Sequence, residues 1–248
     1  PTPTPPAPVV FTPASVSSCD KISSPLLRVG AYSVTTNLWG KGTITNFTEC
    51  ISATSVGTAA NGVAFQTGIT AKWNWDWPAV NSNVKAYPEI LYRPDGKGLT
   101  PIKLTDIGAL TVTHDVSLSA TGDFNLTYDI FVDSTSVVDH SWPHKAEIMI
   151  KLQSTWSDSP VVDTLTVDGN QYDVIVSTMT SGSDSWKFLV FSSKTPLLKA
   201  AIHIKPFVDY LITKGHLLQS DYFTTLEFGT ELVQGAGTAT INAYQVTR

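Results

Sequence analysis

The sequence predicts an all-β domain, a sandwich or barrel of antiparallel strands, with a single helix. From Ser17 onward, short segments rich in Val, Ile, Thr, Tyr and Phe alternate between apolar and polar residues. Turn signals such as "PDGKG", "ATGD", "VDGN" and "TSGSDS" interrupt these segments roughly every 8–15 residues, as in antiparallel sandwiches and barrels. No doubly wound pattern and no glycine-rich phosphate loop after a strand occurs, so a nucleotide-binding fold is excluded.

One stretch, "KPFVDYLITKGHL" at residues 205–217, breaks the strand pattern and predicts the helix. Its apolar side chains recur at helical spacing: Phe207, Val208, Leu211 and Ile212. Pro206 suits the first helical turn, and Gly215 suits the residue after the last turn. We therefore expect one short helix packed on an all-β body.

The amino end differs in composition from the rest of the chain. "PTPTPPAP" is rich in Pro and Thr, favours an extended backbone and contributes nothing to a core. We expect a linker over residues 1–16 and a single globular domain over residues 17–248. A chain of 248 residues with 42% apolar residues can bury a substantial core.

Charge and hydropathy restrict the partners. Charged residues make up 15% of the chain and the net charge is −5, so there is no basic stripe for nucleic acid or an anionic membrane. No apolar run reaches the ~18–20 residues of a membrane span. Low charge with many Ser, Thr, Asn and Trp residues is typical of secreted carbohydrate-active proteins. We expect a secreted monomer that binds neither nucleic acid nor membrane.

The two cysteines, Cys19 and Cys50, agree with an extracellular protein. A disulfide between them would close a loop of about thirty residues and contribute about 3 kcal/mol to stability. Two free buried thiols are the alternative. A zinc site needs more ligands than the two cysteines offer.

Three strand-like segments present carboxylates on one face, because side chains alternate faces along a strand. The three face sets are Glu147, Met149 and Lys151 in "AEIMIKL"; Glu227, Gly229 and Glu231 in "LEFGTEL"; and Asp129, Phe131 and Asp133 in "TYDIFVD". Together they could form one acidic face of a sheet. The alternative is three separate faces exposed to solvent, which is the commoner use of carboxylates on strands.

Tryptophans favour the first interpretation. Trp39 lies in "NLWG", and "WNWDWP" places Trp73, Trp75 and Trp77 on one face of a strand. Indole rings stack on the apolar faces of sugars, so an acidic groove lined with tryptophans suits a glycan. We expect Trp73 and Trp75 to line that groove and Trp77, beside Pro78, to lie in the core.

Several motifs taken together resemble glycoside hydrolase family twelve, the small endoglucanases and xyloglucanases. "NLWG", "VKAYPEI", "YDIF", "EIMI" and "FVDYL…LEFGTEL" occur in the order found in that family. The resemblance runs from about Cys19 to the carboxyl end. It implies a β-jelly-roll sandwich of two antiparallel sheets with a concave substrate cleft and one short helix, and a disulfide between Cys19 and Cys50.

The resemblance also implies the roles of residues in the site. Glu147 of "EIMI" is similar to the family nucleophile, Glu231 of "GTE" to its acid/base, and Asp129 of "YDIF" to the residue that supports the nucleophile. Asn37 and Trp39 of "NLWG" and Met149 resemble its substrate contacts. The implied reaction is retaining, with a carboxyl separation of ~5–5.5 Å, and uses neither cofactor nor metal.

One departure concerns the residue after "EIMI". The family continues with Trp, whereas this chain has Lys151. By alternation Lys151 lies on the face of Glu147, so either it rearranges the substrate contacts or a neighbour such as Trp142 fills the space. We read "HSWPH", with His140 and His144, as a loop and not a metal site.

The expected activity is that of an endo-β-1,4-glucanase acting on cell-wall glucans such as β-glucan, cellulose and xyloglucan. A xyloglucan-specific enzyme is the near alternative. A jelly roll that only binds carbohydrate is the alternative from another class, although such a module has no reason to carry Glu147 and Glu231 in these two motifs.

Overall fold

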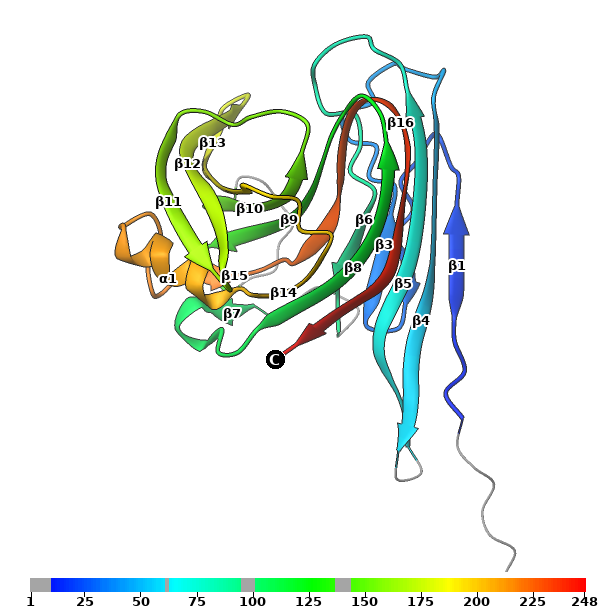
Figure 1. Ribbon diagram of the computed structural model, residues 1–248, viewed down its shortest axis with the longest axis horizontal. Coiled ribbons are helices and arrows are strands. Elements are labelled where there is room, and N and C mark those ends of the chain that lie inside the picture. The colour runs from blue at the N-terminus through cyan, green and yellow to red at the C-terminus, as the bar shows by residue number, and fades with distance from the viewer. Residues whose placement is uncertain (1–9, 61–62, 95–100, 137–143) are drawn as a thin grey trace, which may run out of the picture.

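The computed structural model describes residues 10–60, 63–94, 101–136 and 144–248. Within these ranges the chain forms two β-sheets packed face to face, one α-helix and one short 3-10 helix, η1 (Leu104–Asp106). Figure 1 shows the sheets as the two layers of a sandwich, with the helix at one edge. The expected all-β fold with a single α-helix is confirmed.

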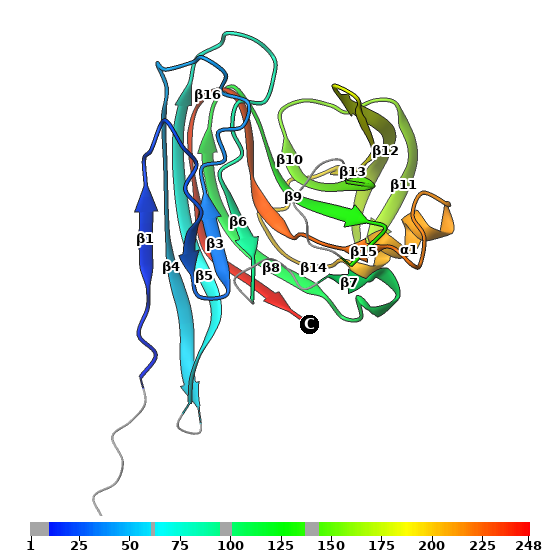
Figure 2. The same cartoon turned by 180° about the vertical axis from the view of Figure 1, so that it is seen from behind.

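The sheet that we call the back sheet is antiparallel throughout, in the order β1-β4-β5-β16-β8-β14. Its strands are β1 (Ser15–Ser18), β4 (Thr48–Ala60), β5 (Val63–Trp77), the carboxyl-terminal half of β16 (Glu227–Thr247), β8 (Thr111–Ala120) and β14 (Lys199–His203). Figure 2 shows the long β4–β5 hairpin reaching past the end of the sandwich beside β1. β1 starts at Ser15, two residues inside the stretch expected to be linker.

The second sheet, which we call the front sheet, runs β2-β3-β6-β16-β9-β10-β13-β12-β11. Its strands are β2 (Leu27–Val29), β3 (Tyr32–Thr35), β6 (Glu89–Tyr92), the amino-terminal half of β16, β9 (Asp123–Asp133), β10 (Ala146–Ser154), β13 (Asp184–Ser193), β12 (Asn170–Ser181) and β11 (Val161–Val167). The short β15 (Tyr222–Phe223) joins β9 to β7 (Ile102–Lys103). β10 and β13 run parallel, whereas we expected antiparallel pairs throughout.

β16 belongs to both sheets. Residues 227–234 pair with β6 and β9 of the front sheet, and residues 235–247 pair with β5 and β8 of the back sheet. The strand changes sheets at Gly235, which has φ +95° and whose added Cβ would lie 2.2 Å from the Thr121 carbonyl oxygen. Only glycine tolerates both the conformation and the close approach.

The front sheet follows the predicted alternation. Ile148, Ile150 and Leu152 of β10 are at most 1% exposed and lie in the core between the sheets. Glu147 and Lys151 lie on the opposite face of the strand. We call this face, turned away from the back sheet, the site face.

The three tryptophans of β5 share one face, as predicted, but this face is the core face of the back sheet. Trp73, Trp75 and Trp77 are 0%, 3% and 2% exposed. The Trp73 Nε1–H donates to the Thr230 hydroxyl at 3.0 Å, and Trp77 stacks on Phe47. The core position of Trp77 is confirmed. The prediction that Trp73 and Trp75 bind substrate is wrong, because no indole face is left open for a sugar.

The helix α1 (Lys205–Thr213) forms where the apolar spacing predicted it. Phe207, Val208 and Leu211 are buried. The Phe207 ring packs edge-on against Tyr172 and Phe191, with ring centroids 5.1 and 4.9 Å apart. The helix therefore covers the core side of β12 and β13. No helix in the described ranges is long and apolar enough to cross a membrane.

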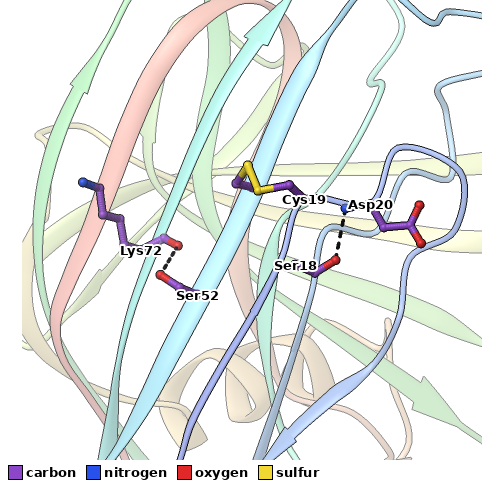
Figure 3. Close-up of a disulfide and its surroundings, with 6 residues drawn as sticks. Ser18, Cys19, Asp20, Ser52 and Lys72 are labelled. Atoms are coloured by element: carbon purple, nitrogen blue, oxygen red, sulfur yellow. Dashed lines mark hydrogen bonds between the residues drawn. A yellow bond between two sulfur atoms is a disulfide. The ribbon is translucent and has the colours of Figure 1, made fainter.

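Cys19 and Cys50 form a disulfide with a Cα–Cα distance of 4.1 Å. It ties the end of β1 to β4, as Figure 3 shows together with the neighbouring Ser18 and Ser52. The alternative of two free thiols is excluded.

Candidate active site

Three adjacent strands of the front sheet bring the predicted acids onto the site face. In the order β16-β9-β10, Asp129 lies opposite Glu227 on one side and opposite Met149 on the other. Glu231 lies opposite Asn125 of β9, and Glu147 lies opposite Phe131. The acids therefore form one face, not three separate solvated ones.

Glu147 is largely buried and held by one directed hydrogen bond. The Trp186 Nε1–H of β13 donates to Glu147 Oε2 at 2.7 Å. Burial raises the pKa of the Glu147 carboxyl to about 7, while the Trp186 hydrogen bond lowers it, the Glu231 charge raises it and the Lys151 charge lowers it. The bond fixes one carboxylate oxygen and leaves the other available for chemistry.

Glu231 is anchored at the other end of the site face by Asn125. The Asn125 side-chain amide donates to Glu231 Oε2, and its carbonyl oxygen accepts from the Glu231 backbone N–H at 3.3 Å. Burial raises the pKa of Glu231, against the lowering effects of Lys151 and of the Asn125 hydrogen bond. A raised pKa favours the protonated form that a general acid needs.

Asp129 lies between these two glutamates and carries its proton more tightly. Burial, followed by the charges of Glu147, Glu227 and Glu231, raises its pKa well above the usual range. Its Oδ1 atom is buried and makes no hydrogen bond within the described part of the chain. The raised pKa favours the protonated form of Asp129, whose O–H could donate to a neighbouring carboxylate.

A second carboxyl pair, Glu89 and Glu227, lies beside Asp129. Sequence reasoning did not select Glu89. Glu89 Oε1 accepts from the Asn37 side-chain amide at 2.7 Å, and the Glu227 carboxyl is within hydrogen-bonding reach. Burial raises the pKa of Glu89 to about 8, and burial together with the Glu89 charge raises the pKa of Glu227 well above its usual range. The sequence signal for Glu89 was an acidic residue next to the apolar Ile90 in "YPEI", a residue that the structure buries.

Asn37 and Trp39 lie in the loop after β3. Asn37 has φ +44°, a conformation that Asn tolerates better than most residues, and its hydrogen bond to Glu89 ties the loop to the site face. The loop is also bonded to the segment before β6, through Tyr87 N–H to the Asn37 carbonyl and Gly40 N–H to the Lys85 carbonyl. Trp39 is 65% exposed, so its indole is open for stacking.

Met149 and Lys151 lie on the same face of β10 as Glu147, but neighbouring side chains bury both of them. Met149 is 1% exposed and packs on Ile175 and Val190. Lys151 is 3% exposed and forms an ion pair with Asp158 at 2.8 Å. The expectation that these side chains contact substrate directly is not met in this structure, because neighbours cover both of them.

The remaining predicted residues lie in or beside the segment 137–143. Trp142 and His140 fall outside the described residues. His144 is buried, with Nδ1 2.9 Å from Asp133 Oδ2 and its ring stacked on Phe131. Among the residues that the structure describes, no group of three or more His, Cys, Asp or Glu side chains could hold a metal ion.

Comparison with known proteins decides the family. The family model described as Glycosyl hydrolase family 12 matches residues 30–247, which includes every acid of the site face. The chain belongs to glycosyl hydrolase family 12. The two-sheet jelly roll implied by the resemblance is thereby confirmed, with the parallel β10–β13 pair as its one departure from antiparallel pairing among the strands described.

Relatives within family 12 carry more than one description. Endoglucanase S of Pectobacterium parmentieri is 26% identical over 226 residues, covering 87% of this chain and 81% of that protein. Xyloglucan-specific endo-beta-1,4-glucanase A of Emericella nidulans is 26% identical, covering 88% and 86%. A protein described as inactive glycoside hydrolase XLP1, from Phytophthora nicotianae, is 25% identical, covering 88% and 87%.

Among solved structures, the native family 12 xyloglucanase from Bacillus licheniformis superposes with a TM-score of 0.79 and is 26% identical, covering 94% of this chain and 99% of that one. Endoglucanase 3 from Trichoderma harzianum has a TM-score of 0.75 at 22% identity, covering 94% and 97%. The similarity to the Trichoderma harzianum enzyme shows a shared fold only.

Proposed function

We propose that this family 12 member is a retaining endo-β-1,4-glucanase that hydrolyses internal bonds of cell-wall glucans. The observation that carries the proposal is the placement of Glu147, Asp129 and Glu231 on three adjacent strands of one sheet face. Each carboxyl has a different environment: an indole N–H on Glu147, a side-chain amide on Glu231 and no conventional partner on Asp129 Oδ1.

These environments suit two displacements at the anomeric carbon. In the first step the ionised Glu147 attacks that carbon while Glu231 gives its proton to the departing glycosidic oxygen. A glucosyl ester forms on Glu147, and the reducing-end fragment leaves as an alcohol. In the second step Glu231, now ionised, takes a proton from water, whose oxygen displaces the ester and regenerates Glu147.

Asp129 contributes through its neutral form. An O–H donated to Glu147 holds the nucleophile in position and adds no charge to the face. As negative charge leaves Glu147 in the first step and returns in the second, this hydrogen bond weakens and strengthens with it. The different environments of these carboxyls are enough to make one a nucleophile and another an acid, so the proposed reaction needs neither cofactor nor metal.

The substrate is proposed from the family and from the open indole of Trp39. The relatives include both endoglucanases and xyloglucan-specific enzymes, so a xylose-branched glucan is the second candidate substrate. A binding-only role is a further candidate because one relative is described as inactive. We also propose secretion as a monomer, supported by the disulfide, since disulfides persist in oxidising compartments.

Initial rates on barley β-glucan, carboxymethylcellulose and tamarind xyloglucan, with product analysis, test the proposal. Glu147→Gln and Glu231→Gln should each lower kcat by several orders of magnitude while the protein stays folded, because each change removes one chemical step. Phe65→Ala, at an exposed position on β5, is the control. Near-normal turnover in either glutamine variant, xylan as the best substrate or release of terminal glucose alone would refute the assignment.

A further inference from the structure

A short segment after β10 folds over Lys151 and presents an indole beside its ammonium group. Lys151 Nζ lies 5.1 Å from the centre of the Trp156 ring and 2.8 Å from Asp158 Oδ1. Trp156 is half-buried, so part of its ring stays open. The indole beside Lys151 therefore comes from position 156, outside β10.

Hydrogen bonds fix the place of this segment in the sheet. The Trp156 N–H donates to Ser154 Oγ at 3.2 Å, and the Ser154 hydroxyl donates to the Trp156 carbonyl at 2.7 Å. Thr155 N–H donates to the Phe124 carbonyl at 3.0 Å, and Phe124 N–H donates to Thr155 Oγ1 at 2.9 Å. The indole is therefore attached to a pinned backbone.

The register places Trp156 at the Glu231 end of the site face. Asn125 of β9 lies opposite Glu231 on one side and opposite Ser154 on the other. Trp156 follows Ser154 by two residues. The charges of Lys151 and Asp158 both act on the pKa of Glu231, in agreement with this register.

The cluster offers the two features that a sugar ring needs. The open part of the Trp156 indole can stack on the apolar face of a pyranose. The Asp158 side chain is 14% exposed, so the open edge of its carboxyl group can accept a hydrogen bond from a sugar hydroxyl. The Lys151 ammonium forms an ion pair with Asp158 Oδ1 and a cation–π contact with the indole, and so ties the two groups together.

We propose that Trp156, held by the Lys151–Asp158 ion pair, is a platform for the sugar on the leaving-group side of the cleaved bond. Glu231 protonates the oxygen of that sugar, so a ring on Trp156 lies on the correct side of the acid. Lys151 is a positioning residue, since it acts on the substrate through Trp156 and Asp158. This inference rests on the proposed glucanase activity.

Kinetics on two kinds of substrate test the platform. An unmodified cellohexaose has a sugar as leaving group, whereas a 4-nitrophenyl cello-oligosaccharide has none on that side. Trp156→Ala should lower kcat/KM for cellohexaose about tenfold or more, the value of one lost stack, and leave the aryl substrate within about twofold. Trp156→Phe keeps a ring and should retain most activity, and Phe65→Ala removes an exposed aromatic far from the cluster.

The pH profile of kcat/KM in Lys151 variants is a second readout. A purely structural role of Lys151 would leave this profile unchanged. The charged groups around it are Glu147, Asp129, Glu231, Asp158 and, across Ser192, the Asp173–Lys194 pair. Lys151→Met removes a positive charge that lowers the pKa of both Glu147 and Glu231, so both limbs of the kcat/KM profile should move to higher pH. Lys151→Arg should restore the profile.

Failure of the platform and failure of the activity give different results. If the wild-type protein cleaves no glucan, the proposed function fails. The platform is then tested by binding: cellohexaose is titrated into the Glu147→Gln variant and into the Glu147→Gln, Trp156→Ala double variant, and the change in fluorescence is followed. Weaker binding in the double variant supports the platform. An unchanged kcat/KM for cellohexaose in Trp156→Ala, an equal loss on the aryl substrate, or no difference in binding overturns it.

Discussion

Glu49 should make the stability of this protein fall as the pH rises, although it takes no part in the proposed chemistry. Its side chain is 1% exposed and points from β4 into the core. Glu49 Oε2 accepts from the Trp77 Nε1–H at 2.8 Å, and Oε1 is buried without a partner among the described residues. Burial raises its pKa from the usual 4.5 to about 8, with the Trp77 hydrogen bond acting in the opposite direction.

The sign and size of the pH effect on stability follow from the pKa of Glu49 in the unfolded chain and in the folded protein. Between about pH 4.5 and 8 the folded protein holds the Glu49 proton while the unfolded chain has lost it. The contribution of Glu49 is thus complete below the unfolded pKa and is lost as pH rises through the folded pKa. From pH 5 to pH 9 the loss amounts to about 4 kcal/mol of unfolding free energy.

Urea unfolding of the wild type and Glu49→Gln at pH 5, 7 and 9 measures this loss. The glutamine keeps an oxygen for the Trp77 N–H and cannot ionise, so its advantage over wild type should grow with pH by about that amount. The other buried carboxyls are present in both proteins, so their contributions cancel in the difference between the two unfolding free energies. Asp76→Asn changes an exposed carboxylate on the opposite face of β5 and is the control. A pH-independent difference between wild type and Glu49→Gln would refute the reasoning.

Three further outcomes are expected. Asp129→Asn should keep a measurable fraction of kcat, because the amide can still donate to Glu147; kinetics showing a loss as large as that of Glu147→Gln would assign Asp129 a larger role. Cys19→Ser with Cys50→Ser should cost about 3 kcal/mol in urea unfolding with activity at 25 °C unchanged, and a lost activity would place the disulfide in the site. Trp39→Ala should raise KM for glucan with little change in kcat, and an unchanged KM would remove Trp39 from the substrate contacts.

Much of the site could be predicted because strand alternation is local. Period-two alternation put Ile148 and Ile150 on one side of β10 and Glu147 on the other, and burial of the aliphatic face decided the orientation. The same alternation grouped Trp73, Trp75 and Trp77, but could not tell which face of β5 was covered. That depends on which sheet β5 joins, a long-range property.

Glu89 and the surroundings of Lys151 were harder to predict for a different reason. Glu89 acquires its environment from Asn37 and Glu227, which are distant along the chain. Lys151 is buried by a turn that brings Asp158 and Trp156 back over it. Alternation predicts the face of a side chain, and not the loop that folds over it.

β16 has a consequence for how this molecule opens. Its first half carries Glu231 in the front sheet, and its second half is a central strand of the back sheet. Separating the two sheets should therefore disturb the strand ladder that holds Glu231. Amide protons of the buried residues in the first half of β16 should therefore exchange slowly, through openings close to global unfolding. Loss of the Glu231 position and opening of the sandwich should therefore occur together.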